Sequence, residues 1–304
     1  FRSDIMRNVP VGFAHHKNPM PSYVLDRALD EMDKYETDGE LLGQLDAGYF
    51  QIGTLGGGNH FIELQEDEEG YLAVMIHSGS RHFGKSVCDY FHQKARALNQ
   101  KWYSQVPDSF RLAFLPADSP EGRQYQNWMQ LSMDFAAENR EKMMLTVKAI
   151  LEKWIGKYTD LTLNFSGEIN CHHNYAALEN HRGKEVWVHR KGAVEAKNGQ
   201  RAVIPGAMGS YSYVVMGLGN EESFCSSSHG AGRRYSRKGA MEAFRCEEVI
   251  LDLERQGVVL GKKGKADVAE ESRFAYKDIE EVMENQKDLV IPLKRLKTIG
   301  VVKG

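Results

Sequence analysis

Short apolar runs and amphipathic helical patterns alternate irregularly along the chain, and this irregularity is what most constrains its fold. Strands are expected within the apolar runs 51–64, 71–81, 161–176, 185–196 and 202–219, several of them next to glycine-rich or polar turns. Apolar residues at helical spacing predict helices over 22–36, 85–102, 119–155 and 241–257, with Ser22 as an N-cap and Gly257 at the last C-terminus. No regular strand–helix–strand spacing is present, so the sequence predicts an α+β fold with a β-sheet core and surrounding helices.

Composition limits the broad class of protein. The 304 residues are 41% hydrophobic, which is enough for a sizeable core, and no linker marks a boundary, so a single domain over 1–304 is expected. A net charge of -3 excludes a general polycation. The four cysteines form no CxxC pair, which favours a reducing compartment. No apolar run approaches the roughly 18 residues of a membrane helix and no signal-peptide pattern is present, so no membrane association and a cytoplasmic location are expected.

Several of the eleven histidines share one setting, in which a short apolar run ends and the histidine stands beside a small or amide residue. The clearest are His60 after Asn59, His77 before Ser78, His173 before Asn174, and His229 before Gly230. Imidazole is the commonest nitrogen ligand, and three imidazoles suit an ion of the zinc or manganese type. Their spacing matches no compact metal motif, so the ligands would have to converge from distant segments. Taken singly, each of these histidines is more often structural than functional.

Glycine-rich and basic turns point to an anionic ligand. The backbone N–H groups of GTLGGGNH (53–60) could approach a phosphate, although no Walker A or Rossmann pattern follows, and a plain tight turn explains the same residues. Arg81, the Arg190-Lys191 pair and the basic residues after His229 all stand beside glycine or serine, which suggests phosphate clamps. Glu63 lies in an apolar run, where it either reads a polar ligand edge or faces solvent.

The stretch SSSHGAGRRYSRK (226–238) places one unhindered histidine, His229, before four cations. A metal ligand, a base, a nucleophile and an ordinary loop residue are all compatible with this pattern alone. Small neighbours would give access to the imidazole, and nearby positive charge would keep it neutral.

Taken together, these passages resemble the RtcB family of GTP-dependent RNA ligases, in its bacterial type. The matching stretches are GTLGGGNHFIE, HSGSR, INCHHNY, RKGAV, IPGAMG, GLGNEESFCSSSHGAGRRYSR, AYKDI and the terminal VKG, in the family's order from residue 53 to 304. The resemblance implies a compact catalytic domain with its own topology, unlike the Rossmann or classical nucleotidyltransferase folds.

The resemblance also implies roles for individual residues. His229 matches the nucleophile that carries GMP as a phosphoramidate, and the matches to the manganese ligands are His60, His77 and His173. Matches to the guanylate-binding positions are Asn59, Phe61, Glu63, Asn174, Ala231, Gly232, Tyr276 and Lys303, with Glu63 reading the guanine edge. Positions that hold the RNA phosphate end match Arg81, Lys191 and Arg237.

The implied reaction joins an RNA 3'-phosphate or 2',3'-cyclic phosphate end to a 5'-hydroxyl end, in tRNA splicing or RNA repair. GTP and two Mn²⁺ ions are the implied cofactors, RNA is the implied partner, and helper proteins are not visible in the sequence. Without GTP, the same histidines and arginines would serve a metal-dependent RNA phosphodiesterase or phosphatase. A binding module for RNA ends, without activity, is the remaining alternative.

One departure from the family pattern concerns the metal ligands. The family places an Asp and a Cys of a D-x-G-C motif upstream of all these stretches, and no such motif occurs here. Because the chain begins at Phe1, an N-terminal segment carrying these ligands is expected to precede it; the alternative is a relative with a depleted metal site. A smaller departure is His82 after HSGSR, which is expected to be exposed or to lie behind the metal ligands.

Overall fold

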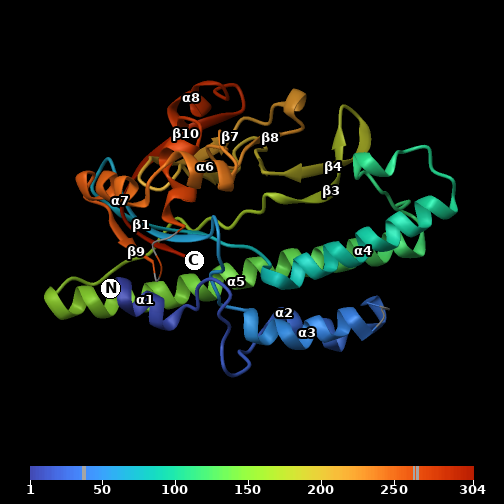
Figure 1. The fold of residues 1–304 in the computed structure, drawn as a ribbon, viewed down its shortest axis with the longest axis horizontal. Coiled ribbons are helices and arrows are strands. Elements are labelled where there is room, and N and C mark those ends of the chain that lie inside the picture. The colour runs from blue at the N-terminus through green and yellow to red at the C-terminus, as the bar shows by residue number, and fades with distance from the viewer. Residues whose placement is uncertain (36–38, 263, 265–266) are drawn as a thin grey trace. The chain divides into compact units, whose positions relative to one another are not determined.

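The computed structural model describes residues 1–35, 39–262, 264 and 267–304, and these divide into two compact units. The first unit comprises Phe1–Gly12, Leu55–His77 and Met144–Gly304, and the second comprises Phe13–Thr54 and Ser78–Met143. Helices and strands are both abundant and do not repeat in βαβ order (Figure 1), which confirms the α+β prediction. The single domain over 1–304 stays a prediction.

The first unit is built on a curled sheet of six strands in the order β2-β1-β10-β7-β6, with β9 added in parallel to β10. The other pairings are antiparallel, and the long strand β10 contacts three neighbours. The strands are β1 (Phe61–Asp67), β2 (Leu72–His77), β6 (Arg201–Ile204), β7 (Ser212–Gly217), β9 (Val259–Gly261) and β10 (Val290–Lys303).

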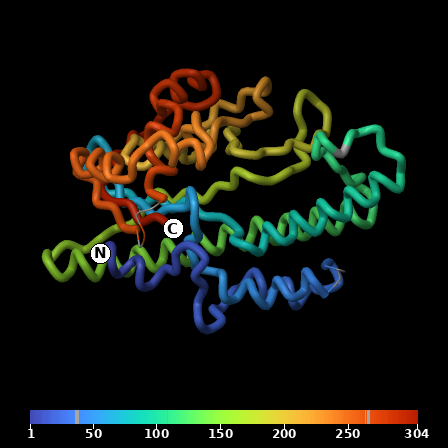
Figure 2. The backbone as a smooth tube through the Cα atoms, viewed as in Figure 1, coloured from blue at the N-terminus to red at the C-terminus, as the bar shows by residue number. Residues whose placement is uncertain are grey.

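Two smaller antiparallel pairs complete the strands of this unit. The hairpin of β3 (Asn174–His181) and β4 (Lys184–Lys191) turns at residues 182–183, and its strands run side by side in Figure 2. Strand β5 (Ala193–Glu195) pairs with β8 (Ser226–Ser228), the strand that leads directly to His229. Helices and 3-10 turns fill the connections: α1 (Arg2–Asn8), η3 (Glu221–Ser223), α6 (Arg237–Ala243), α7 (Cys246–Arg255), η4 (Val268–Glu271), η5 (Arg273–Ala275) and α8 (Ile279–Glu284).

The second unit is helical. It contains α2 (Tyr23–Asp30), η1 (Met32–Tyr35), α3 (Gly39–Gln51), α4 (Arg81–Lys101), η2 (Asp108–Phe110) and the part of α5 (Pro120–Tyr158) before Met144. Its core is aromatic, because the rings of Phe83, Trp128 and Phe135 are fully buried and pack on one another. The Ser22 side chain accepts a hydrogen bond from Leu25 N, which confirms Ser22 as the N-cap of α2.

Most of the predicted elements are present, and three predictions were wrong. The helix predicted over 22–36 ends at Asp30, and a 3-10 turn, η1, follows Glu31. No strand forms over residues 161–173, although polar and apolar residues alternate there. Leu161 is exposed, and the chain pairs only from Asn174, because alternation fixes a period but supplies no partner strand. The helix predicted over 241–257 is interrupted at Phe244 and Arg245 between α6 and α7. The last residue of the helix predicted over 22–36 lies outside the described residues.

Among the residues that the structure describes, no helix is both long enough and apolar enough to cross a bilayer. The longest, α5, carries many charged side chains on its surface.

Candidate active site

Four histidines predicted as site residues lie together in the first unit. The ring centroid of His77 lies 5.8 Å from that of His60, 5.0 Å from that of His173 and 6.3 Å from that of His229. His173 and His229 stack at 4.8 Å with an angle of 13° between their planes. Segments that are far apart in the sequence therefore bring four imidazoles into one cluster, which is the convergence that a metal site built from these histidines would require.

Strand register explains how the cluster forms. Phe61 of β1 pairs with His77 of β2, so His60, one residue before β1, lies beside the end of β2. The last residues of β10 lie along the same edge, because Phe61 pairs also with Lys303 and the carbonyl of His60 accepts a hydrogen bond from Gly304 N. The ends of three neighbouring strands thus build one side of the cluster.

Gly192 connects the other two histidines. Its N–H donates to the carbonyl of His173 (2.8 Å), and its carbonyl lies 2.7 Å from Nδ1 of His229. A carbonyl oxygen can only accept, so Nδ1 of His229 carries the proton and Nε2 carries the lone pair. The backbone at Gly192 has φ +70°, and a Cβ there would lie 3.2 Å from Cε1 of His229. Glycine at this position therefore allows the turn and the close approach of the imidazole.

Burial favours the neutral form of two imidazoles of this cluster, those of His77 and His229. It lowers the pKa of His229, and the positive charge of Lys191 lowers it further against the opposing hydrogen bond to Gly192. The pKa of His77 is held well below its ordinary value by burial and then by the neighbouring His173, His60 and His229. A neutral imidazole offers a lone pair to a metal ion, so the donor set formed by His60, His77 and His173 fits a Zn²⁺- or Mn²⁺-type ion.

The four cations that follow His229 were predicted to keep its imidazole neutral, but none of them is the cation that lowers its pKa. The four that follow it each lie within 4 Å of a carboxylate, in the pairs Arg233–Glu271, Arg234–Glu281, Arg237–Glu270 and Lys238–Glu242. Burial is the largest influence on the pKa of His229, and the cation that lowers it is Lys191. Arg190, predicted as an anion clamp with Lys191, is buried and forms an ion pair with Glu179, so that prediction was wrong for Arg190.

The glycine-rich loop before β1 packs on Arg237. A Cβ at Gly58 would lie 2.6 Å from both terminal guanidinium nitrogens, and Gly58 has φ +70°. Arg237 Nη2 donates to Oδ1 of Asn59 at 3.5 Å. The loop and the segment after His229, both predicted to hold phosphates, are therefore in direct contact.

Glu63 lies inside the sheet, so the prediction that it faces solvent was wrong. Its exposed fraction is 4%, and its carboxyl accepts hydrogen bonds from Gln65 Nε2 (2.7 Å) and Thr298 Oγ1 (3.0 Å). Burial raises the pKa of Glu63 to about 7, while both hydrogen bonds and the charge of Lys303 oppose the shift. The carboxyl is thus held in place by internal partners, and reading a guanine edge stays a prediction.

Glu271 was missed by the sequence analysis and organises two residues predicted as guanylate contacts. Its buried carboxyl accepts from the Tyr276 hydroxyl (2.6 Å) and from Lys303 Nζ (3.0 Å), and it also forms an ion pair with Arg233. The pKa of Tyr276 is raised by burial and by this carboxylate. The only sequence signal was an acidic pair, Glu270-Glu271, shortly before AYKD, and such pairs are common on exposed surfaces.

The remaining predicted guanylate contacts lie near these residues in the first unit. Phe61 is buried with its ring 5.5 Å from Lys303 Nζ, and Asn174 Oδ1 accepts from Gly192 N. Ala231 donates its N–H to the Pro205 carbonyl, and Gly232 accepts from Lys277 N.

Arg81 and His82 belong to the second unit. Arg81 begins α4 with a positive φ of 57°, and its Nε donates to Thr54 Oγ1. Burial lowers the pKa of Arg81. His82 is exposed, in agreement with its prediction.

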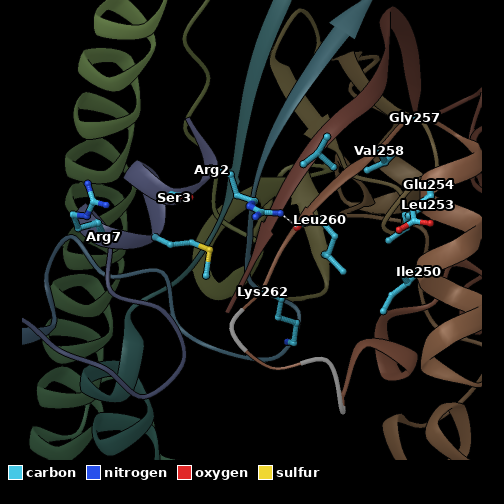
Figure 3. Close-up of a pocket in the computed structure, with 12 residues that line it drawn as sticks. Arg2, Ser3, Arg7, Ile250, Leu253, Glu254, Gly257, Val258, Leu260 and Lys262 are labelled. Atoms are coloured by element: carbon cyan, nitrogen blue, oxygen red, sulfur yellow. Dashed lines mark hydrogen bonds between the residues drawn. The ribbon is translucent and has the colours of Figure 1, made fainter.

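A separate cavity of about 890 Å³ lies between α1 and the α7–β9 segment (Figure 3). Arg2 extends into this region and donates to the Leu260 carbonyl, with Ile250 and Leu253 supplying apolar surface. None of the predicted site residues is among the described residues that line it. Its size alone gives it no role in the chemistry of the histidine cluster.

Comparison with known proteins decides the family. The family model described as "tRNA-splicing ligase RtcB" matches residues 2–304. The chain belongs to the RtcB family. It is 42% identical over 267 residues to the RNA-splicing ligase RtcB of Escherichia coli strain K12, an alignment that covers 84% of this chain and 62% of that protein. The chain thus spans less than two thirds of this relative.

Other RtcB relatives come from distant organisms. The RNA-splicing ligase RtcB of Mycobacterium tuberculosis strain H37Rv is 34% identical, with 86% of this chain and 66% of that protein aligned. The tRNA-splicing ligase RtcB of Nanoarchaeum equitans is 31% identical, over 99% of this chain and 75% of that protein. Bacterial and archaeal members therefore align with most of the length of this chain.

Proposed function

We propose that this chain carries the catalytic site of a GTP-dependent RNA ligase. It would join RNA 3'-phosphate or 2',3'-cyclic phosphate ends to 5'-hydroxyl ends, in tRNA splicing or RNA repair. The observation that carries the proposal is His229, whose Nδ1 is tied to the Gly192 carbonyl so that a neutral Nε2 lone pair is left beside three further imidazoles. The ligase names of the relatives support the same function.

The first step is nucleophilic. The lone pair on Nε2 of His229 attacks the α-phosphorus of GTP, an N–P bond forms, and pyrophosphate leaves. The hydrogen bond from Nδ1–H to Gly192 O stabilises the positive charge that develops on the ring. Burial holds the pKa of His229 below its ordinary value, so the nucleophile is neutral before GTP binds.

The later steps transfer and then release GMP. An oxygen of the RNA 3'-phosphate attacks the phosphorus of the His229 adduct, which breaks the N–P bond and leaves the RNA end activated as a diphosphate linked to guanosine. A 5'-hydroxyl then attacks the RNA phosphorus, and GMP leaves. A 2',3'-cyclic phosphate would first be opened by water. In the first unit, Lys191 and Arg237 are proposed to hold the RNA phosphate end, where arginine's fork matches phosphate geometry. For Arg81 of the second unit, a phosphate contact stays a prediction.

GTP is proposed to lie along the glycine-rich loop before β1, with Asn59, Phe61 and Glu63 at its base. Tyr276 and Lys303, fixed by Glu271, are proposed as further guanylate contacts, together with Asn174, Ala231 and Gly232. Mn²⁺ bound by His60, His77 and His173 would supply positive charge against the phosphates. We also propose a cytoplasmic location, with no membrane partner.

The test is the intact mass of the protein after incubation with GTP and Mn²⁺. The parent is expected to gain one GMP, and His229→Ala to gain none. His189→Ala is the matched control, because His189 is an exposed histidine on β4 and should leave the adduct unchanged.

Three outcomes count against the proposal. An adduct on His229→Ala would refute this nucleophile. Opening of a cyclic phosphate without GTP, and with no adduct, would favour the phosphodiesterase. RNA binding with strong salt dependence but neither activity would favour the binding module.

A further inference from the structure

A second group of potential metal ligands lies outside the histidine cluster. His181 stands at the end of β3, Glu221 begins η3, and Cys225 precedes β8. One ligand atom from each lies within 4.8 Å of the other two. Nδ1 of His181 is 3.0 Å from Glu221 Oε2, and Sγ of Cys225 is 3.9 Å from Glu221 Oε1. No role was assigned to any of the three from the sequence.

The environment of His181 fixes which ring nitrogen carries a proton. Oε2 of Glu179 lies 2.9 Å from Nε2, and both carboxyl oxygens of Glu179 also accept from the buried guanidinium of Arg190. A carboxylate held by arginine is ionised and accepts only, so Nε2 of His181 carries the proton. The hydrogen bonds to Glu179 and then to Glu221 raise the pKa of His181, so without a metal ion a proton also lies on Nδ1. When that proton is lost, the Nδ1 lone pair points toward Glu221 and Cys225. Metal-bound histidines show the same arrangement, with a carboxylate on the far nitrogen.

Something positive must lie between Nδ1 and Glu221. A lone pair and a carboxylate oxygen 3.0 Å apart repel each other unless a proton or a metal ion lies between them. A proton would make an imidazolium held by two carboxylates, but it leaves the nearby thiol without a function. Cys225 is 7% exposed, and burial followed by the charge of Glu221 raises the pKa of its thiol. A metal ion accounts for all three side chains.

We propose that His181, Glu221 and Cys225 bind a divalent ion of the zinc class, at a site separate from the histidine cluster. Imidazole, carboxylate and thiolate are all zinc ligands, and the half-exposed side chain of Glu221 leaves room for water as a fourth ligand. On binding, Nδ1 of His181 and the thiol of Cys225 each lose a proton to solvent. The thiolate and Glu221 then balance the two charges of the ion, while Glu179 and Arg190 balance each other.

The site would position the nucleophile, an effect that rests on the proposed function. Phe224 and Cys225 both have positive φ, at 52° and 47°, a conformation that is strained for residues with a Cβ. Arg190 donates to the Phe224 carbonyl, and Ala196 N donates to the Cys225 carbonyl at 2.7 Å. Strand β8 runs from here to His229. A metal ion on Cys225 would therefore hold the start of the strand that ends at the nucleophile.

The experiment uses Co²⁺ as the probe on the full chain, after chelation of any bound metal. A thiolate bound to Co²⁺ gives a charge-transfer absorption that imidazole and carboxylate ligands do not give. The parent and His77→Ala are expected to show this absorption, because His77 belongs to the other cluster. Cys225→Ser is expected to lose it, while Cys88→Ser, at an exposed cysteine, and Cys171→Ser, next to the histidine cluster in sequence, are expected to retain it.

Circular dichroism on each variant separates loss of the ion from loss of the fold. If Cys225→Ser is unfolded, His181→Gln is used in its place, and loss of one Co²⁺ per chain with retained secondary structure supports the proposal. Absence of the thiolate absorption in the parent, or its retention in folded Cys225→Ser, overturns it. The GMP adduct on His229 is measured separately, so a parent that forms the adduct but lacks the absorption refutes only this inference. A parent with the absorption but no adduct refutes only the proposed function.

Discussion

Replacing Gly192 by alanine should slow the reaction proposed for His229, because the added methyl group would press on the imidazole ring. The accompanying loss of stability should not be the cause. Gly192 has φ +70°, and an added Cβ would lie 3.2 Å from Cε1 and 3.3 Å from Nδ1 of His229. Gly183, in the turn between β3 and β4, has a similar φ of +75° but nothing within 4 Å of an added Cβ. The pair of variants Gly192→Ala and Gly183→Ala therefore carries the same backbone strain, and only one of them touches the nucleophile.

The expected magnitudes follow from these contacts. A residue other than glycine at such a φ costs about 1–3 kcal/mol, so both variants should lose stability by similar amounts. At Gly192 the imidazole must also move by a few tenths of an ångström, while its hydrogen bond to the same residue's carbonyl is disturbed. Since nucleophilic attack depends steeply on alignment, adduct formation should slow on the order of 10-fold in Gly192→Ala and little in Gly183→Ala.

The assay is single-turnover formation of the His229–GMP adduct at saturating GTP and Mn²⁺, with urea unfolding of both variants. Equal rates of adduct formation in the two folded variants would refute the reasoning, since the contact with the imidazole would then have no effect. A slow Gly183→Ala would point instead to strain in the hairpin as the cause.

Two further predictions concern buried carboxyl groups. The folded state keeps the proton of Glu63 up to about pH 7, whereas the unfolded chain loses it near the ordinary value of 4.5. The free energy of unfolding should therefore fall by about 3 kcal/mol as the pH rises between these values. Glu63→Gln should remove this decline, as measured by urea unfolding of the metal-free protein at pH 5 and pH 8; an unchanged decline contradicts the assignment. Glu271→Gln leaves the buried ammonium of Lys303 without its carboxylate and should cost about 3–5 kcal/mol. Glu281→Gln removes only the exposed ion pair with Arg234 and should lower the free energy of unfolding by less than about 1 kcal/mol. Equal losses of stability in Glu271→Gln and Glu281→Gln would argue against Glu271 as the buried partner of Lys303.

The histidine cluster was predictable because its signal is local. His60, His77, His173 and His229 each stand where an apolar run meets a small or amide residue, and strand ends bring such positions together. The resemblance of the surrounding motifs to one family then added roles that spacing alone left open. Helices α2, α4 and α5 were likewise predictable from their apolar spacing and, for α2, from its cap, whereas α3 was not predicted.

The parts that escaped prediction depend on tertiary partners. Nothing in the sequence distinguishes Glu271 from a solvated acid, since its role comes from folding back onto the nearby Tyr276 and from Lys303 of β10. Arg190 belongs to a basic stretch of the sequence, yet its side chain is buried in an ion pair with Glu179 on the neighbouring strand β3. The segment 161–173 has the alternation of a strand and no strand beside it.

The pairing of β1 with β10 has a consequence for how the protein acquires its site. Phe61 pairs with Lys303, far along the chain, and the helical segment Ser78–Met143 of the second unit lies between them in the sequence. Contacts between such distant positions close large loops and form slowly. The cluster of imidazoles and the buried Lys303 therefore come together only when these distant strand ends pair, so the site proposed around His229 depends on one of the long-range contacts of the fold.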